Sequence, residues 1–192
     1  METTRIYQPP IYWVFILTGF ALSIPLIAMQ FTSSVNWDLL DFSIAGLLLA
    51  SSGLALRWLV WRSKDPWFRI GSIIGILAVF LLIWSNLAVG LIGSGPNLPN
   101  LLFGLIPLIG IIGAIRSHFS SKGLFRSMVT MAIAILTMGI VSFLLSDLKN
   151  WENSFTAIFL VTGFFSFLFL VSALFFKVSE KRKGKASNPS TR

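Results

Sequence analysis

The side chains that carry most enzyme and metal chemistry are nearly missing from the apolar stretches of this sequence. The chain has no cysteine and a single histidine, His118, which excludes thiolate nucleophiles, zinc–thiolate sites, iron–sulfur clusters and a haem held by two histidines of one chain. No Asp, Glu, Lys or His lies well inside a long apolar run, whereas membrane proteases and proton-coupled transporters need such groups at depth. We therefore expect no catalytic residue, no cofactor and no metal, and a protein that is not an enzyme.

The most informative local pattern consists of polar and small residues rather than charged ones. It runs from Trp84 to Gly93 with the sequence WSNLAVGLIG, and Asn86, Gly90 and Gly93 would share one face of a continuous helix. Small residues on that face would let a second helix approach closely, and Asn86 could then form a hydrogen bond across the contact. The pattern fits a helix-packing seam, which we favour, or a polar lining for a ligand or ion path.

The segment that follows this pattern, SGPNLPN over residues 94–100, is typical of a tight turn. Gly, Pro and Asn adopt turn conformations for backbone reasons. A short hairpin between two apolar runs is one interpretation, and a partly re-entrant segment that presents two asparagines to a cavity is the alternative. The candidate packing or lining residues are Trp84, Asn86, Gly90, Gly93, Asn97 and Asn100.

These residues need apolar helices to position them, and the sequence contains six apolar runs. Hydrophobic residues make up 55% and charged residues 11% of the 192 residues, whereas soluble domains have roughly 45–50% and about 25%. Each run comes close to the roughly 20 residues that cross a bilayer as a helix. The predicted spans are 11–31, 42–61, 70–92, 98–115, 127–145 and 154–176.

Lysine and arginine determine the predicted orientation of these spans. Fourteen of the fifteen basic residues fall on one side of the six-span arrangement, and only Lys149 falls on the other. Basic residues are enriched on the cytoplasmic side of membrane proteins. We therefore predict an all-α bundle of six transmembrane helices with both termini in the cytoplasm. Residues 1–10 precede the bundle, residues 11–176 form it, and residues 177–192 form a basic, disordered tail.

The net charge of +8 reflects this asymmetry rather than a nucleic-acid partner, because no basic stripe with interleaved exposed aromatics is present. Each basic residue near an anionic lipid surface contributes about 1 kcal/mol of attraction. The tail therefore either contacts anionic lipid or serves only as a topology signal during insertion. The basic residues concerned are Lys181, Arg182, Lys183 and Lys185.

Two closely spaced pairs of glycines, Gly71 with Gly75 and Gly110 with Gly113, suit close contact between membrane helices. This spacing does not distinguish packing within the chain from dimerisation. The predicted partners are therefore the lipid bilayer and either another membrane protein or a second copy of this chain.

The stretch WxNLAVGxIG at residues 84–93, followed by Asn97 and by PNL at residues 99–101, resembles a family of small, uncharacterised bacterial inner-membrane proteins. Weaker similarity extends over roughly residues 37–176. The family pattern has two acidic residues where this chain has GP at residues 95–96. The resemblance implies a multi-pass protein of the bacterial inner membrane, and it implies no activity.

Two classes of function remain open. A non-enzymatic accessory or structural membrane subunit is favoured, because no charged residue lies deep inside a span and no internal repeat is visible. A small transporter or channel for an uncharged or lipid-like solute is the alternative. A polar cavity that reaches Asn86 would favour transport, and dry packing around Asn86 would favour the first class.

Overall fold

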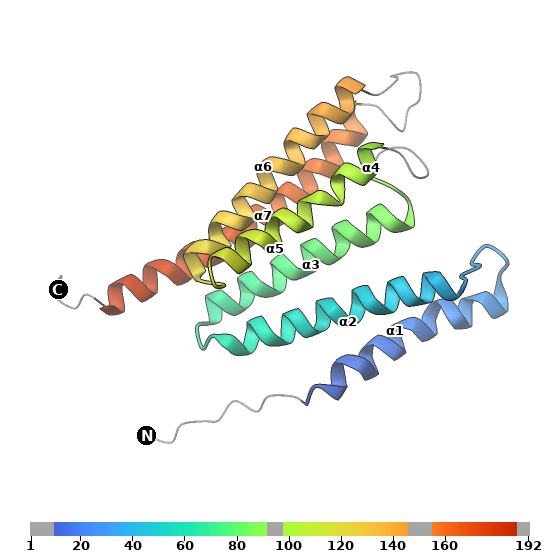
Figure 1. Ribbon diagram of the computed structural model, residues 1–192, viewed down its shortest axis with the longest axis horizontal. Helices are drawn as coiled ribbons and strands as arrows, with labels where there is room; N and C mark the ends of the chain where they lie inside the picture. The colour runs from blue at the N-terminus through green and yellow to red at the C-terminus, as the bar shows by residue number, and fades with distance from the viewer. Residues whose placement is uncertain (1–9, 92–97, 146–154, 188–192) are drawn as a thin grey trace. The chain divides into compact units, whose positions relative to one another are not determined.

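The apolar runs fold into helices joined by short connections (Figure 1). The computed structural model describes residues 10–91, 98–145 and 155–187, and these residues form seven helices. α1 (Tyr12–Phe31) and α2 (Leu39–Arg62) belong to one compact unit, the N-terminal hairpin, and the remaining helices form a second unit, the C-terminal bundle. The bundle contains α3 (Pro66–Ala88), α4 (Leu98–Phe103), α5 (Leu105–Arg116), α6 (Ser121–Leu145) and α7 (Phe155–Ser187).

Five of the described helices, α1, α2, α3, α6 and α7, are long and apolar enough to cross a membrane. The predicted fourth span, 98–115, is instead two short helices that meet at Gly104. Pro107 explains the break, because its nitrogen carries no hydrogen and cannot donate to the carbonyl of Phe103 one turn earlier. The structure therefore gives an all-helical chain with five helices of membrane-spanning length and one shorter apolar stretch.

Three helices, α2, α3 and α6, begin at an earlier residue than the apolar runs predicted, because capping residues precede those runs. Asp38 and Asp41 each accept the other's backbone N–H, at 2.8 and 3.0 Å, which is the capping box that begins α2. The carboxylate of Asp65 accepts the N–H of Trp67 at 3.2 Å, and a proline follows it at the first position of α3, as helix starts favour. The hydroxyl of Ser120 accepts an N–H of the first turn of α6 at 3.2 Å.

α7 continues beyond Phe176, the predicted end of the sixth span, so residues 177–187 are helical where we predicted disorder. The reason is packing, because Ser179 is fully buried and its hydroxyl lies 3.0 Å from that of Ser121 at the start of α6. Lysine, arginine and glutamate in this stretch also favour helix. Residues 188–192 lie outside the described part of the chain.

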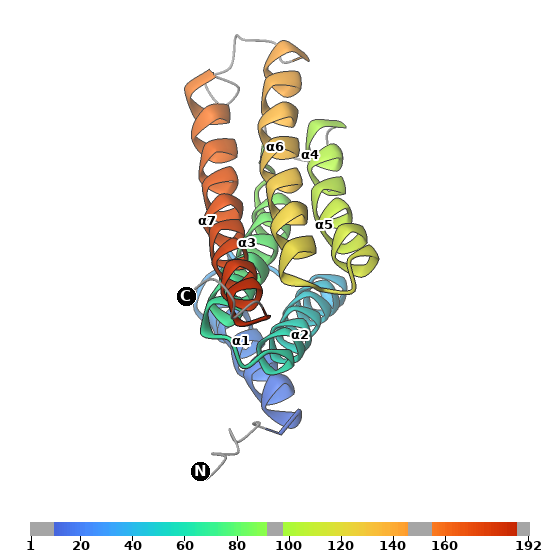
Figure 2. The same cartoon turned by 90° about the vertical axis from the view of Figure 1, so that its left-hand side faces the viewer.

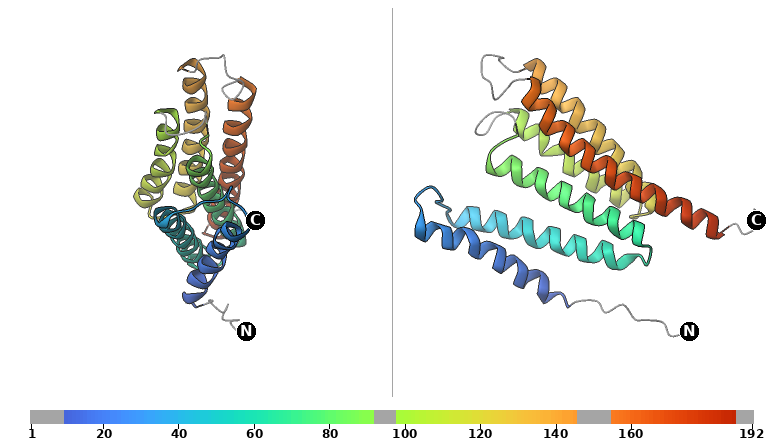
Figure 3. Two further views of the ribbon diagram at one scale, coloured as in Figure 1. Left: turned by 90° about the vertical axis from the view of Figure 1, so that its right-hand side faces the viewer. Right: turned by 180° about the vertical axis from the view of Figure 1, so that it is seen from behind.

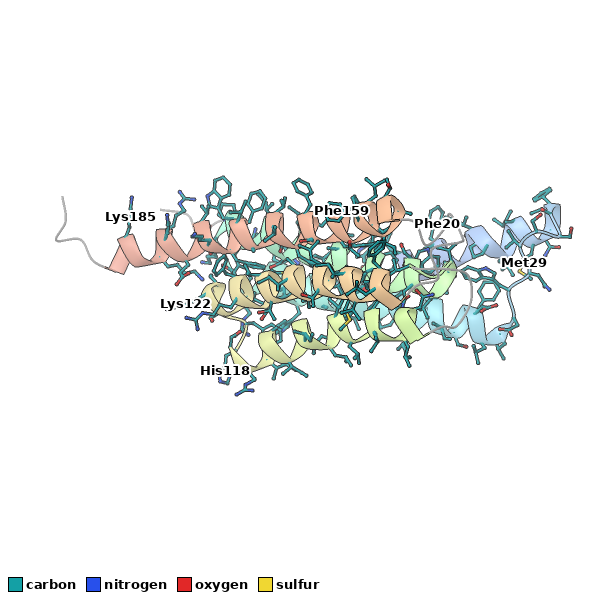
Figure 4. The ribbon with its side chains drawn as sticks, turned by 90° about the horizontal axis from the view of Figure 1, so that it is seen from above. Phe20, Met29, His118, Lys122, Phe159 and Lys185 are labelled. Carbon is teal, nitrogen blue, oxygen red and sulfur yellow. The ribbon has the colours of Figure 1, made fainter. Side chains whose placement is uncertain are left out.

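In the N-terminal hairpin, α1 packs along α2 through small residues of α2. A Cβ built at Gly46 would lie 3.3 Å from Leu22 Cδ1, and one built at Gly53 would lie 2.7 Å from Val14 Cγ1. α1 nevertheless buries no residue, and Phe20, labelled in Figure 4, is 71% exposed. So large an apolar surface would favour aggregation in water, whereas a bilayer solvates it with lipid.

In the C-terminal bundle, α7 packs between α3 and α6, and α6 packs between α7 and α5 (Figures 2 and 3). The core follows these contacts. Phe68 of α3, Met131 of α6 and Phe169 and Phe176 of α7 are at most 2% exposed. The rings of Phe68 and Phe176 meet edge to face with their centroids 5.3 Å apart, a favourable geometry for aromatic pairs.

Candidate functional site

Asn86 and Asn100 meet where the end of α3 approaches α4. The amide Nδ2 of Asn86 donates to the backbone carbonyl of Asn100 at 2.8 Å, and Oδ1 of Asn100 accepts the N–H of Leu91 at 2.9 Å. Asn100 is only 6% exposed. The predicted interhelical hydrogen bond of Asn86 is therefore confirmed, with a backbone carbonyl as its acceptor. Trp84, two residues before Asn86, stacks on Phe80 with 5.9 Å between ring centroids.

The predicted helical face of Asn86, Gly90 and Gly93 does not form, because α3 ends at Ala88. Gly90 has a φ of 77°, a left-handed conformation that glycine adopts without the steric penalty of a Cβ. Such a glycine commonly terminates a helix, and Gly90 lies just past the end of α3. Gly93 and Asn97 lie outside the described residues.

A hollow of about 390 Å³ lies between the end of α3 and α7. Ser85 and Gly90 line it from one side, and Phe164 and Phe165 line it from the other. Ser85 is the one polar side chain among its lining residues, and Asn86 does not line it. Oδ1 of Asn86 is buried and accepts no hydrogen bond from the residues that the structure describes. The hollow thus suits an apolar group and gives an ion no set of ligands.

A second hollow, of about 230 Å³, lies between α6 and α7. Gly139 and Phe143 of α6 and Phe159 and Thr162 of α7 are among its lining residues. Thr162 is its one polar side chain, and that hydroxyl already donates to the carbonyl of Ile158 at 2.8 Å. This hollow also offers a solute apolar contacts and no open polar group.

Serine hydroxyls inside the bundle connect α7 to both of its neighbours. Oγ of Ser172 donates to the carbonyl of Gly71 on α3 at 2.8 Å, and Oγ of Ser166 donates to the carbonyl of Ala132 on α6 at 3.2 Å. Hydrogen bonds of this kind contribute about 0.6–2 kcal/mol each between membrane helices. Sequence analysis missed these serines, although their position inside a phenylalanine-rich apolar run was an available signal.

The two glycine pairs mediate helix contacts inside the bundle. A Cβ added at Gly71 or Gly75 would meet side chains of α7, and one added at Gly110 or Gly113 would meet side chains of α6. Glycine at these positions therefore permits the close approach of neighbouring helices. Of the two interpretations left open by the sequence, contact within the chain is the one that the structure contains.

The single histidine terminates α5. His118 has a φ of 49°, its N–H donates to the carbonyl of Ile115, and the N–H of Phe119 donates to the carbonyl of Ala114, both at 2.9 Å. These two hydrogen bonds form a Schellman motif. Within residues 10–91, 98–145 and 155–187, no three or more His, Cys, Asp or Glu side chains lie together as a metal site would require.

The described interior can hold helices together and accommodate apolar groups. Its hydroxyl and amide donors serve helix contacts, and the hollows beside the end of α3 and between α6 and α7 are lined mostly by apolar side chains. No protein-family model, no curated protein and no solved structure matches this chain.

Proposed function

We propose that this protein is a six-span component of a bacterial inner membrane that acts as a non-enzymatic accessory or structural subunit. The observation that carries the proposal is that polar side chains inside the C-terminal bundle form hydrogen bonds between helices. The amide of Asn86 is bonded to Asn100, and the hydroxyls of Ser166 and Ser172 are bonded to backbone carbonyls. A transport path for an ion or a polar solute would need polar groups left open to the solute, whereas these groups join helices.

The six-span arrangement is supported by the length of the broken fourth segment. α4 and α5 together run from Leu98 to Arg116. At about 1.5 Å per residue they would cover about 28 Å, close to the roughly 30 Å of bilayer hydrocarbon. With this segment as a span, the basic ends of α2, α5 and α7 fall on one side, which the positive-inside rule places in the cytoplasm.

Reporter fusions test this topology. A reporter fused after Arg192 should be active in the cytoplasm, and one inserted within residues 147–152 should be active in the periplasm. A fusion within residues 63–65, between α2 and α3, is the control and should match Arg192. If the reporters at Arg192 and within 147–152 give the same compartment, the arrangement is wrong.

The N-terminal hairpin supports an accessory role, because α1 buries no side chain in the structure. A photo-crosslinking amino acid at Phe20, which is 71% exposed, should yield a protein adduct of defined mass in cells, whereas the same amino acid at Phe169, which is 0% exposed, should not. Lipid adducts alone at Phe20 would contradict a partner on this surface.

Transport of an uncharged or lipid-like solute is the second candidate function, and the apolar hollow between α6 and α7 is the observation that favours it. Ile140 lines this hollow and is 60% exposed, so Ile140→Trp should narrow the hollow without disturbing the core. Saturable binding of a fluorescent fatty acid that Ile140→Trp abolishes would support this function. Failure of the purified protein to bind the probe would favour the accessory role.

A further inference from the structure

All charged side chains that the structure describes in the C-terminal bundle belong to one end of it, where α3 and α6 begin and α5 and α7 end. Figure 4 shows Lys122 and Lys185 at this end and Phe159 far from it. Ten of these side chains are basic and two are acidic. The basic residues are Lys64, Arg69, Arg116, Lys122, Arg126, Lys177, Lys181, Arg182, Lys183 and Lys185, and the acidic ones are Asp65 and Glu180.

The last turns of α7 fix one of these cations in place. Phe176, Ser179 and Lys183 are spaced to share a face of α7, and Ser179 and Ser121 are buried with their hydroxyls 3.0 Å apart. Nζ of Lys183 donates to the same Ser121 hydroxyl at 3.2 Å and lies 5.4 Å from the centre of the Phe68 ring. Lys183 is solvent-exposed, and its ammonium group contacts α6 through Ser121 and α3 through Phe68.

The charge of Lys183 lacks a neutralising partner in the described part of the bundle, since neither Asp65 nor Glu180 forms an ion pair with it there. An ammonium group has three N–H donors, and Ser121 accepts one. The group also stands at the N-terminus of α6, whose partial positive charge disfavours a cation. Lys122 follows Ser121 directly in the sequence and adds a second positive charge to this end of the bundle. An anion at this position would offset these charges.

We propose that the cluster of Lys183, Ser121 and Lys122 binds the phosphate group of an anionic membrane lipid. The occupant is a lipid because the cluster lies just past the last apolar turns of α7, at the depth where headgroups meet a membrane-spanning helix. This inference goes beyond the proposed function and requires only that the bundle spans a membrane.

The test compares two substitutions that remove the same charge from the same helix. Lys183→Gln removes the ammonium that contacts Ser121 and the Phe68 ring, whereas Lys185→Gln removes the ammonium of the lysine two residues later. The purified full-length protein is titrated with phosphatidylglycerol or phosphatidylcholine in mild detergent, and bound lipid is counted by native mass spectrometry. We expect Lys183→Gln to weaken phosphatidylglycerol binding about fivefold, which corresponds to about 1 kcal/mol, and Lys185→Gln to change it less than twofold.

Two further variants separate loss of the site from loss of the fold. Lys183→Arg keeps the charge and should keep most of the phosphatidylglycerol affinity, and Ser121→Ala should weaken binding because it frees the ammonium. Equal losses for Lys183→Gln and Lys185→Gln would mean diffuse attraction and would overturn the site. Equal affinity for phosphatidylcholine, or displacement of the lipid by inorganic phosphate at similar concentration, would overturn the assignment of the occupant.

Discussion

Gly75→Ala tests whether the contact between α3 and α7 depends on the absence of one side chain. An added Cβ would lie 2.8 Å from Oγ of Ser172 and 3.2 Å from Cε of Met128. The end of a methionine side chain is flexible and can move away. Ser172 is held more firmly, because its Oγ donates to the carbonyl of Gly71 at 2.8 Å. Either this hydrogen bond breaks or the helices move apart.

The expected effect is a net loss of up to about 2.5 kcal/mol in the free energy of unfolding. Breaking the interhelical hydrogen bond costs about 0.6–1.7 kcal/mol, and overpacking a close contact costs about 1–3 kcal/mol. Alanine regains about 0.5–1 kcal/mol relative to glycine inside a helix. Gly163→Ala on α7 is the matched control, because nothing lies within 4 Å of its added Cβ. That control should stabilise the protein by about 0.5–1 kcal/mol.

The assay is denaturant unfolding in mixed micelles, followed by circular dichroism, on a double-mutant cycle with Ser172→Ala. If the hydroxyl is the obstacle, Gly75→Ala should cost less than about 0.5 kcal/mol in the Ser172→Ala background. Additive losses in the double variant would refute this reasoning. So would a Gly163→Ala variant that is destabilised as much as Gly75→Ala.

Three further predictions use the same unfolding assay. Asn86→Leu should cost about 1 kcal/mol, because it removes the 2.8 Å hydrogen bond to Asn100; an unchanged midpoint would contradict that role. Gly123→Ala should lower the midpoint sharply, because the new Cβ would overlap the Cβ of Ser117. His118→Gly should stabilise by about 1 kcal/mol, because a φ of 49° is costly for any residue with a Cβ; a destabilised variant would show that the imidazole has contacts that outweigh this strain.

The sequence predicted where most helices lie, because length and hydropathy are local properties of the chain. It misplaced the helix ends, because the residues that cap them lie outside the apolar runs. Asp65 starts α3 ahead of the predicted residue 70, and Gly90 ends a helix that was predicted to reach residue 92. The extension of α7 was missed because it depends on the burial of Ser179 against another helix.

The sequence predicted only part of the candidate site, because local patterns do not specify tertiary contacts. Asn86 was expected to form a bond across a helix contact because an amide in an apolar helix needs a partner, and it does. The role of Gly90 was not specified, because a glycine at i+4 suits both a packing face and a helix end. The acceptor at Asn100 depends on how α4 returns towards α3, which local patterns do not specify.

The hydrogen bonds of α7 favour a bundle in which this helix keeps its position over one in which it moves during transport. Membrane helices gain little from hydrophobic burial against one another, because lipid is equally apolar, so close approach and interhelical hydrogen bonds hold them together. α7 is bonded to α3 through Ser172 and to α6 through Ser166. Any rocking of α7 that opened a path on one side would break one of these bonds, at about 0.6–2 kcal/mol, and would separate Gly71 and Gly75 from the helix that they fit. Transport would thus have to work against the contacts that define the bundle, whereas a structural subunit depends on them.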